Sequence, residues 1–136
     1  MAARRVREIM SAQFLAVGPG ATASELQAFV QRGHLGDVFV VEGEEQRLAG
    51  KVPLARLVTA REDQTAGELG EPIGLCLEAS DDLWSGFLAI ENFVGYSVPV
   101  VADSRSMRLL GVVTESDFIS AYRHSVTDAR EEQAHG

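Results

Sequence analysis

The feature that most constrains this chain is an internal repeat with a period of about 60 residues. Each copy contains three short apolar runs rich in β-branched residues, and such runs predict strands. In both copies a polar loop separates the second run from the third. The predicted strands are residues 14–17, 37–41 and 48–52 in the first copy, and 75–77, 97–101 and 109–113 in the second.

A helix is predicted after the first run of each copy, in the stretches ATASELQAFVQRG (21–33) and ASDDLWSGFLAIENF (79–93). Their apolar side chains recur at spacings of three and four, which places them on one side of a helix. Trp84 lies off the centre of that stripe, so it is either a half-exposed packing residue or an anchor for a second chain. The residues expected in the core or at an interface are Leu26, Phe29, Val30, Leu83, Phe87, Leu88 and Ile90.

Each copy therefore follows the order strand, helix, strand, strand, helix. A unit of about 60 residues is too small to bury its own core, so the two copies are expected to pack on each other with pseudo-twofold symmetry. The predicted fold class is α+β, an α/β sandwich of two β-α-β-β-α repeats. We expect the first repeat at 6–63, the second at 64–124 and a disordered acidic tail at 125–136.

Composition and charge exclude several kinds of function. A net charge of -8 disfavours binding to nucleic acid or to an anionic membrane surface. The single cysteine, Cys76, excludes a disulfide within the chain and favours a reducing, cytoplasmic compartment. The three histidines are too far apart in sequence to predict a metal site. No run approaches the ~18 apolar residues that predict a membrane-spanning helix.

The candidate site is the stretch GVVTESD, where the last strand passes directly into a helix. Thr114 is expected to cap that helix, with Asp117 folding back in a capping box, and this structural role alone explains both residues. The alternative is a ligand site, because a helix N-terminus attracts phosphate and a fixed carboxylate accepts hydrogen bonds from ribose hydroxyls. The first copy has Pro53 and Arg56 at the equivalent positions, which favours one ligand site per chain, in the second copy.

The doubled unit, the SVPVV run and the closing GVVTESD resemble the cystathionine β-synthase domain, or CBS domain, whose tandem pairs form Bateman modules. The resemblance extends from residue 6 to about residue 124. It implies that AMP, ADP or ATP is a regulatory ligand, with Thr114 at the phosphate or ribose and Asp117 at the ribose hydroxyls. The positions that match the base-binding residues of the family are Leu75, Cys76, Leu77, Ser97, Val98 and Pro99.

Two considerations limit this interpretation. Packing in a core is a sufficient explanation for Cys76 and Val98 without any ligand. Few cations are placed to meet phosphate, so modest nucleotide affinity is expected. The candidates are Lys51, Arg56, Arg123 and His124.

No set of nucleophile, base and metal ligands is present in the sequence, so a regulatory module rather than an enzyme is predicted.

A second resemblance concerns the regulated partner. Residues 93–101, 109–118 and 119–123 are similar to the cytoplasmic C-terminal CBS pair of bacterial voltage-gated-type chloride channels. That similarity implies a membrane transport domain N-terminal to this segment, and a homodimer formed through the CBS helices. The alternative is an interaction module that dimerises and binds no nucleotide.

Overall fold

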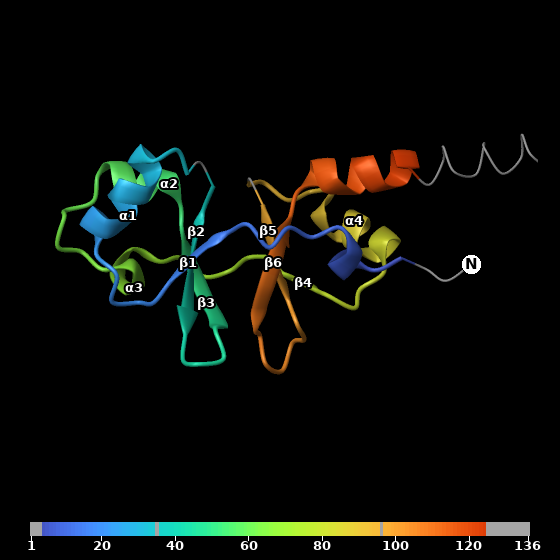
Figure 1. The fold of residues 1–136 in the computed structure, drawn as a ribbon, viewed down its shortest axis with the longest axis horizontal. Coiled ribbons are helices and arrows are strands. Elements are labelled where there is room, and N and C mark those ends of the chain that lie inside the picture. The colour runs from blue at the N-terminus through green and yellow to red at the C-terminus, as the bar shows by residue number, and fades with distance from the viewer. Residues whose placement is uncertain (1–3, 35, 96, 125–136) are drawn as a thin grey trace, which may run out of the picture.

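The computed structural model describes residues 4–34, 36–95 and 97–124, which form two lobes side by side (Figure 1). Each lobe is built on a three-stranded sheet in which the first strand is parallel to the second and the second is antiparallel to the third. The strands are β1 (Leu15–Val17), β2 (Val38–Glu42) and β3 (Arg47–Val52) in the first sheet, and β4 (Leu77–Glu78), β5 (Val98–Val101) and β6 (Leu109–Val113) in the second.

The predicted α+β class with a doubled unit is confirmed by this topology. The pseudo-twofold symmetry extends to detail, because both sheets contain an irregularity at the same place, after Val40 in one and after Val100 in the other. The strand predicted at 75–77 is shorter than expected, since only Leu77 and Glu78 pair with β5. The tail predicted at 125–136 lies outside the described residues.

The helices lie at the two ends of the molecule, away from the junction between the sheets (Figure 1). Four of them begin at a side chain that accepts a hydrogen bond from a backbone N–H three residues later, namely Thr22, Thr65, Asp82 and Thr114. Such caps satisfy N–H groups that the first turn leaves free. The helices are η1 (Val6–Glu8), α1 (Ala23–Gln31), α2 (Leu54–Val58), α3 (Ala66–Leu69), α4 (Leu83–Ile90) and a last helix at 115–124.

The apolar interior has three parts. One cluster lies within each lobe, between its sheet and its helices. The third lies between the two sheets and joins the lobes. The repeats therefore pack face to face, because neither sheet has a second layer of its own to cover that face. The buried members of the third cluster are Phe39, Val41 and Leu48 from the first lobe and Val101, Leu109 and Val112 from the second.

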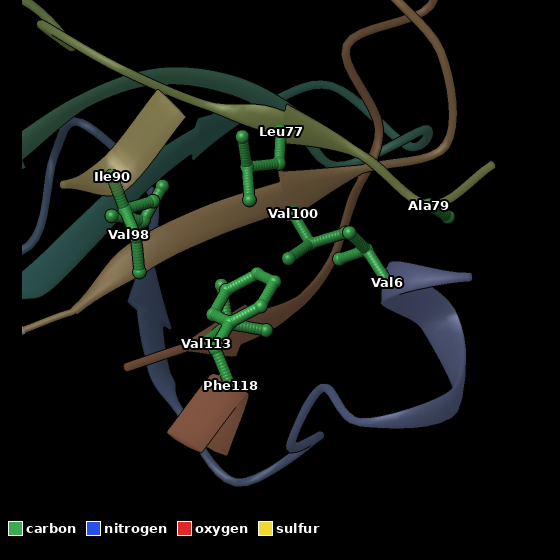
Figure 2. Packing of buried hydrophobic residues seen from close by; sticks show 8 residues of the cluster. All are labelled: Val6, Leu77, Ala79, Ile90, Val98, Val100, Val113 and Phe118. Atoms are coloured by element: carbon green, nitrogen blue, oxygen red, sulfur yellow. The ribbon is translucent and has the colours of Figure 1, made fainter. Parts of the chain in front are cut away.

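A short segment precedes the first strand of each repeat, running from η1 to Ser11 in the first repeat and from α3 to Glu71 in the second. These two segments, called the lead-ins, are exchanged between the lobes. Val6 of η1 is fully buried in the second lobe, where Figure 2 shows it in one cluster with Val100 and Phe118. Conversely, Ala66 and Leu69 of α3 belong to the core of the first lobe. Each spatial lobe therefore contains the lead-in of the other repeat, and the boundary proposed between residues 63 and 64 stays a prediction about the sequence repeat.

Backbone hydrogen bonds fix this exchange. Ser11 and Val112 bond each other through both N–H groups, at 2.9 Å each. Glu71 and Lys51 make the same reciprocal pair in the other half, at 2.7 and 3.0 Å. Each lead-in thus adds one bridge to the third strand of the opposite lobe, which positions it at the junction between the lobes. In the described part of the chain, no helix is long and apolar enough to cross a membrane.

Candidate functional site

A cavity of about 780 Å³ opens at the junction of the two repeats. Three of the residues predicted from sequence lie on its wall, namely Ser97, Thr114 and Asp117. They come from the ends of β5 and β6 and from the first turn of the last helix. The opposite wall is formed by residues of the first repeat. The two sides of the cavity therefore carry different side chains. Its other lining residues are Ser11, Gln13, Phe14, Leu15, Phe29, Gly33, His34, Gly36, Asp37, Phe39 and Val112.

Thr114 and Asp117 form the predicted capping box. The N–H of Thr114 donates to Oδ2 of Asp117 at 2.8 Å, and the N–H of Asp117 donates to the Thr114 hydroxyl oxygen at 3.3 Å. The box holds the carboxylate in a fixed orientation at the cavity wall. Each carboxylate oxygen has two lone pairs, so Asp117 retains capacity to accept hydrogen bonds from a ligand.

Five predicted residues do not line this cavity. Leu77 and Val98 are buried in the core of the second lobe, and Leu75 packs against that core. Pro99 is buried in β5, and Cys76 packs against the cluster between the sheets. Burial raises the pKa of the Cys76 thiol, and the nearby carboxylates of Glu78 and Asp81 raise it further. Packing accounts for the position of each of these five side chains.

The cavity is instead lined by the lead-in of the first repeat, which sequence reasoning missed. These lining residues can be identified by comparing the two repeats through the pairing of their strands. Val17 pairs with Val40 just as Leu77 pairs with Val100, so the counterpart of Leu75 in the first repeat is Leu15. Leu15 lines the cavity with Thr114, because the chain crosses the junction between Ser11, which bonds to Val112 of β6, and β1 of the first sheet.

The first-repeat wall combines aromatic and polar groups. Phe14 and Phe39 meet edge to face, with ring centroids 6.5 Å apart. His34 Nε2 lies 3.3 Å from the carbonyl oxygen of Asp37. An apolar wall with a few fixed polar groups is the usual lining for a planar heterocyclic ligand. The arrangement therefore suits a ring against the phenylalanines and hydroxyl groups at Asp117.

The equivalent positions of the first repeat are occupied by protein contacts. Arg56, which stands where Asp117 stands, donates from Nη1 to the carbonyl oxygen of Leu69 at 3.0 Å. Its guanidinium also lies 3.9 Å from the Glu71 carboxylate. Pro53, which stands where Thr114 stands, has no side-chain hydroxyl to offer. The two halves of the molecule are therefore alike in backbone and different in chemistry.

Metal chemistry finds no support in the described residues. Across 4–34, 36–95 and 97–124, no three His, Cys, Asp or Glu side chains come close enough together to hold a metal ion.

Comparison with protein families identifies the repeat. A model of the CBS domain matches residues 6–63 and 87–124. The chain belongs to the CBS domain family. The first matched segment covers the first repeat and the second covers the second repeat from residue 87 onward, so the molecule is a tandem CBS pair. No curated protein sequence matches the chain at a significant level.

Solved structures of CBS pairs share this fold. The CBS pair of a putative Mg²⁺ transporter from Shewanella oneidensis is 22% identical, with a TM-score of 0.79 over 93% of this chain and 74% of that one. The cytosolic domain of the Mg²⁺ channel MgtE in complex with ATP is 26% identical, with a TM-score of 0.71 over 82% of this chain. The chain spans 46% of that domain.

A third structure carries different adenosine compounds. The CBS pair of protein MJ0100, in complex with 5′-methylthioadenosine and S-adenosyl-L-methionine, is 17% identical. Its TM-score is 0.70 over 91% of this chain and 99% of that one. CBS pairs of the same architecture thus hold adenosine compounds with quite different charges on the 5′ substituent.

Proposed function

We propose that this CBS pair is a regulatory module that binds one adenosine compound in the cavity between its repeats. Binding there would favour one arrangement of the repeats and so control an attached or associated protein. The observation that carries the proposal is the meeting of Thr114, Asp117 and Ser97 with the aromatic wall of the first repeat in a single cavity. No catalytic step is part of the proposal.

The geometry supports specific roles for two residues. Asp117, oriented by the capping box, would accept hydrogen bonds from the ribose 2′- and 3′-hydroxyls. Phe14, a half-buried phenylalanine of the facing wall, would contact the base. Phe39 is only 1% exposed and packs behind Phe14, edge to face, in the cluster between the sheets. The predicted base-binding roles of Leu75, Cys76, Leu77, Val98 and Pro99 receive no support from this arrangement, since packing already accounts for their positions.

The test is ligand binding by the Asp117→Asn variant, measured by calorimetry and by thermal unfolding with millimolar adenosine, AMP, ADP and ATP. Asparagine retains the size of the side chain but weakens its capacity to accept two hydroxyl hydrogen bonds. We expect at least tenfold weaker binding of whichever compounds bind the wild-type protein.

The matched control is Asp82→Asn, because Asp82 also caps a helix, accepting from the Ser85 N–H at 2.8 Å, but does not line the cavity. It should bind as the wild type does. Failure of every adenosine compound to bind the wild-type protein would refute the nucleotide role and favour an interaction module without a ligand.

The regulated partner is proposed to be a membrane transport protein, with the module on its cytoplasmic face. The sequence similarity in residues 93–101, 109–118 and 119–123 favours a chloride channel. Two of the similar structures described above come from proteins named as magnesium transport proteins, which supports transport without supporting chloride. Sequencing the gene upstream of Met1 tests this directly, since hydrophobic spans of the transport domain are expected there.

Dimerisation is the second part of the proposal, and a different surface supports it. Between α4 and the last helix lies an apolar groove of about 500 Å³. Trp84 is 64% exposed and Tyr122 is 68% exposed at its edges. Leu88, expected in the core or at an interface, is also 48% exposed, which fits an interface. The groove is lined mainly by Leu83, Trp84, Phe87, Phe118, Ile119 and Tyr122.

A second copy of the chain is the proposed occupant, packing helix against helix through this groove. Large exposed apolar patches with aromatic residues are typical of such interfaces. Sedimentation should give a dimer for the wild type and a monomer for Trp84→Glu. The control is Val58→Glu, which places the same charge at an 83% exposed apolar residue of the first lobe. A monomeric wild type, or a dimeric Trp84→Glu variant, would contradict the proposal.

A further inference from the structure

We propose that the cavity selects adenosine compounds whose 5′ substituent is neutral or positively charged, and that it discriminates against AMP, ADP and ATP. This inference rests on the proposed function and narrows its ligand class. Compounds of the selected class are adenosine itself, a 5′-thioether of adenosine, and a sulfonium derivative such as S-adenosyl-L-methionine.

The charges on the cavity wall carry the argument. Among the described residues, the lining contains two carboxylates, Asp37 and Asp117, and one imidazole, His34, but no lysine or arginine. Phosphate groups are normally held by guanidinium or ammonium groups. A 5′-phosphate inside this cavity would therefore meet carboxylates without a strong cation to balance it, whichever way the nucleoside is oriented.

The nearest lysine is held by other partners. Lys51 lies beside the cavity wall, with its ammonium nitrogen 3.8 Å from Oδ2 of Asp37. The same nitrogen lies 5.6 Å from the ring centroid of Phe93. Both side chains of the ion pair are more than 80% buried, at 19% exposed for Lys51 and 15% for Asp37. Because breaking a partly buried pair leaves an uncompensated charge, Lys51 is not free to move to a phosphate.

The helix N-terminus does not replace the missing cation. The first turn of the last helix already contains two carboxylates, Glu115 and Asp117. The Asp117 carboxylate accepts the N–H of Thr114, and the Thr114 hydroxyl accepts the N–H of Asp117. These negative charges offset the positive end of the helix dipole that would otherwise attract phosphate. The same charges favour a cationic 5′ substituent.

The remaining nearby cations face a different hollow. Arg4, Arg123 and His124 line a depression that shares only Asp117 with the main cavity, among the described residues. The Arg32 guanidinium lies 5.8 Å from the ring centroid of the lining residue Phe29, but Arg32 is not itself part of the cavity lining. The Arg4 guanidinium is 4.0 Å from the Glu8 carboxylate. A ligand in the main cavity would therefore lie beside the carboxylates of Asp37 and Asp117, whereas Arg123 and His124 line the other hollow.

The experiment compares affinities by calorimetry under one set of buffer conditions. The probes are 5′-methylthioadenosine, S-adenosyl-L-methionine, AMP and ATP, the last with and without Mg²⁺. We expect AMP to bind at least about tenfold more weakly than 5′-methylthioadenosine, and ATP more weakly still. Asp37→Asn removes one carboxylate and releases Lys51, so it should reduce the ratio of 5′-methylthioadenosine affinity to AMP affinity at least about tenfold.

The control variant is Asp63→Asn, which makes the same chemical change at a side chain that is 86% exposed and outside the cavity lining. It should leave the order and spacing of the affinities unchanged. AMP or ATP binding as tightly as 5′-methylthioadenosine would overturn the charge-selection inference while leaving the proposed function intact. Absence of binding by all four probes would overturn both.

Discussion

The carbonyl oxygen of Ser11 lies only 2.7 Å from the point where a Cβ atom would stand on Gly111. Gly50 has the same relation to the carbonyl oxygen of Glu71, at 2.8 Å. Each glycine sits in the third strand of one lobe, and each carbonyl belongs to the lead-in of the other repeat. The absence of a side chain therefore allows the exchanged lead-ins to approach the strands closely enough to form their backbone hydrogen bonds.

Gly111→Ala should destabilise the protein by about 1–3 kcal/mol, because backbone must move to admit the new methyl group. Denaturant unfolding measures the loss as a lower midpoint at an unchanged slope. The control is Gly18→Ala, since a Cβ on Gly18 would have no atom within 4 Å. Equal stability of the two variants would show that the lead-in tolerates displacement from β6.

Much of the fold was predictable from sequence because its signals are local. The apolar, β-branched runs at 37–41 and 97–101 predicted β2 and β5, and the apolar spacing at 21–33 predicted α1. Thr114 and Asp117 were predicted as a capping box because their spacing alone defines one. These features depend on neighbours three or four residues away.

The exchange of lead-ins was not predictable in this way. Residues 6–10 and 66–70 match loosely in sequence, and this local pattern does not decide which lobe each segment joins. Which one packs where depends on contacts between residues some 70 to 100 positions apart, such as Ser11 with Val112. Leu75 was expected at the ligand from the family resemblance, whereas its counterpart Leu15 lines the cavity.

Val6→Ala tests the energetic contribution of the exchange. Val6 is fully buried in the core of the second lobe, although it precedes that lobe's strands by some 70 residues. Loss of two buried carbon atoms should lower the free energy of unfolding by about 1.5–2.5 kcal/mol. Amide exchange in β5 and β6 should accelerate accordingly. The same change at Val94, which is 93% exposed, should have almost no effect; similar losses for both variants would argue against the exchange.

Acid sensitivity should depend on the cap of α4. Hydrogen bonds from the backbone N–H and the hydroxyl of Ser85 lower the pKa of Asp82 below its ordinary value. A carboxyl group whose pKa is lower in the folded state stabilises the fold above its unfolded pKa of about 3.9, and this contribution disappears as pH falls through the folded pKa. Wild type should therefore exceed Asp82→Asn in stability at neutral pH, and the two should converge below about pH 4. A constant difference down to about pH 2 would contradict this.

The number of bound ligands should be one per chain. In the second repeat, Thr114 and Asp117 face a cavity, whereas in the first repeat the Arg56 guanidinium is occupied by the Leu69 carbonyl and the Glu71 carboxylate. Calorimetry with whichever adenosine compound binds most tightly should give a stoichiometry near one. Arg56→Ala should keep that stoichiometry and affinity, because Arg56 does not line the cavity. Two equivalents per chain, or loss of binding in Arg56→Ala, would mean that the first repeat also supplies a site despite the contacts that occupy it.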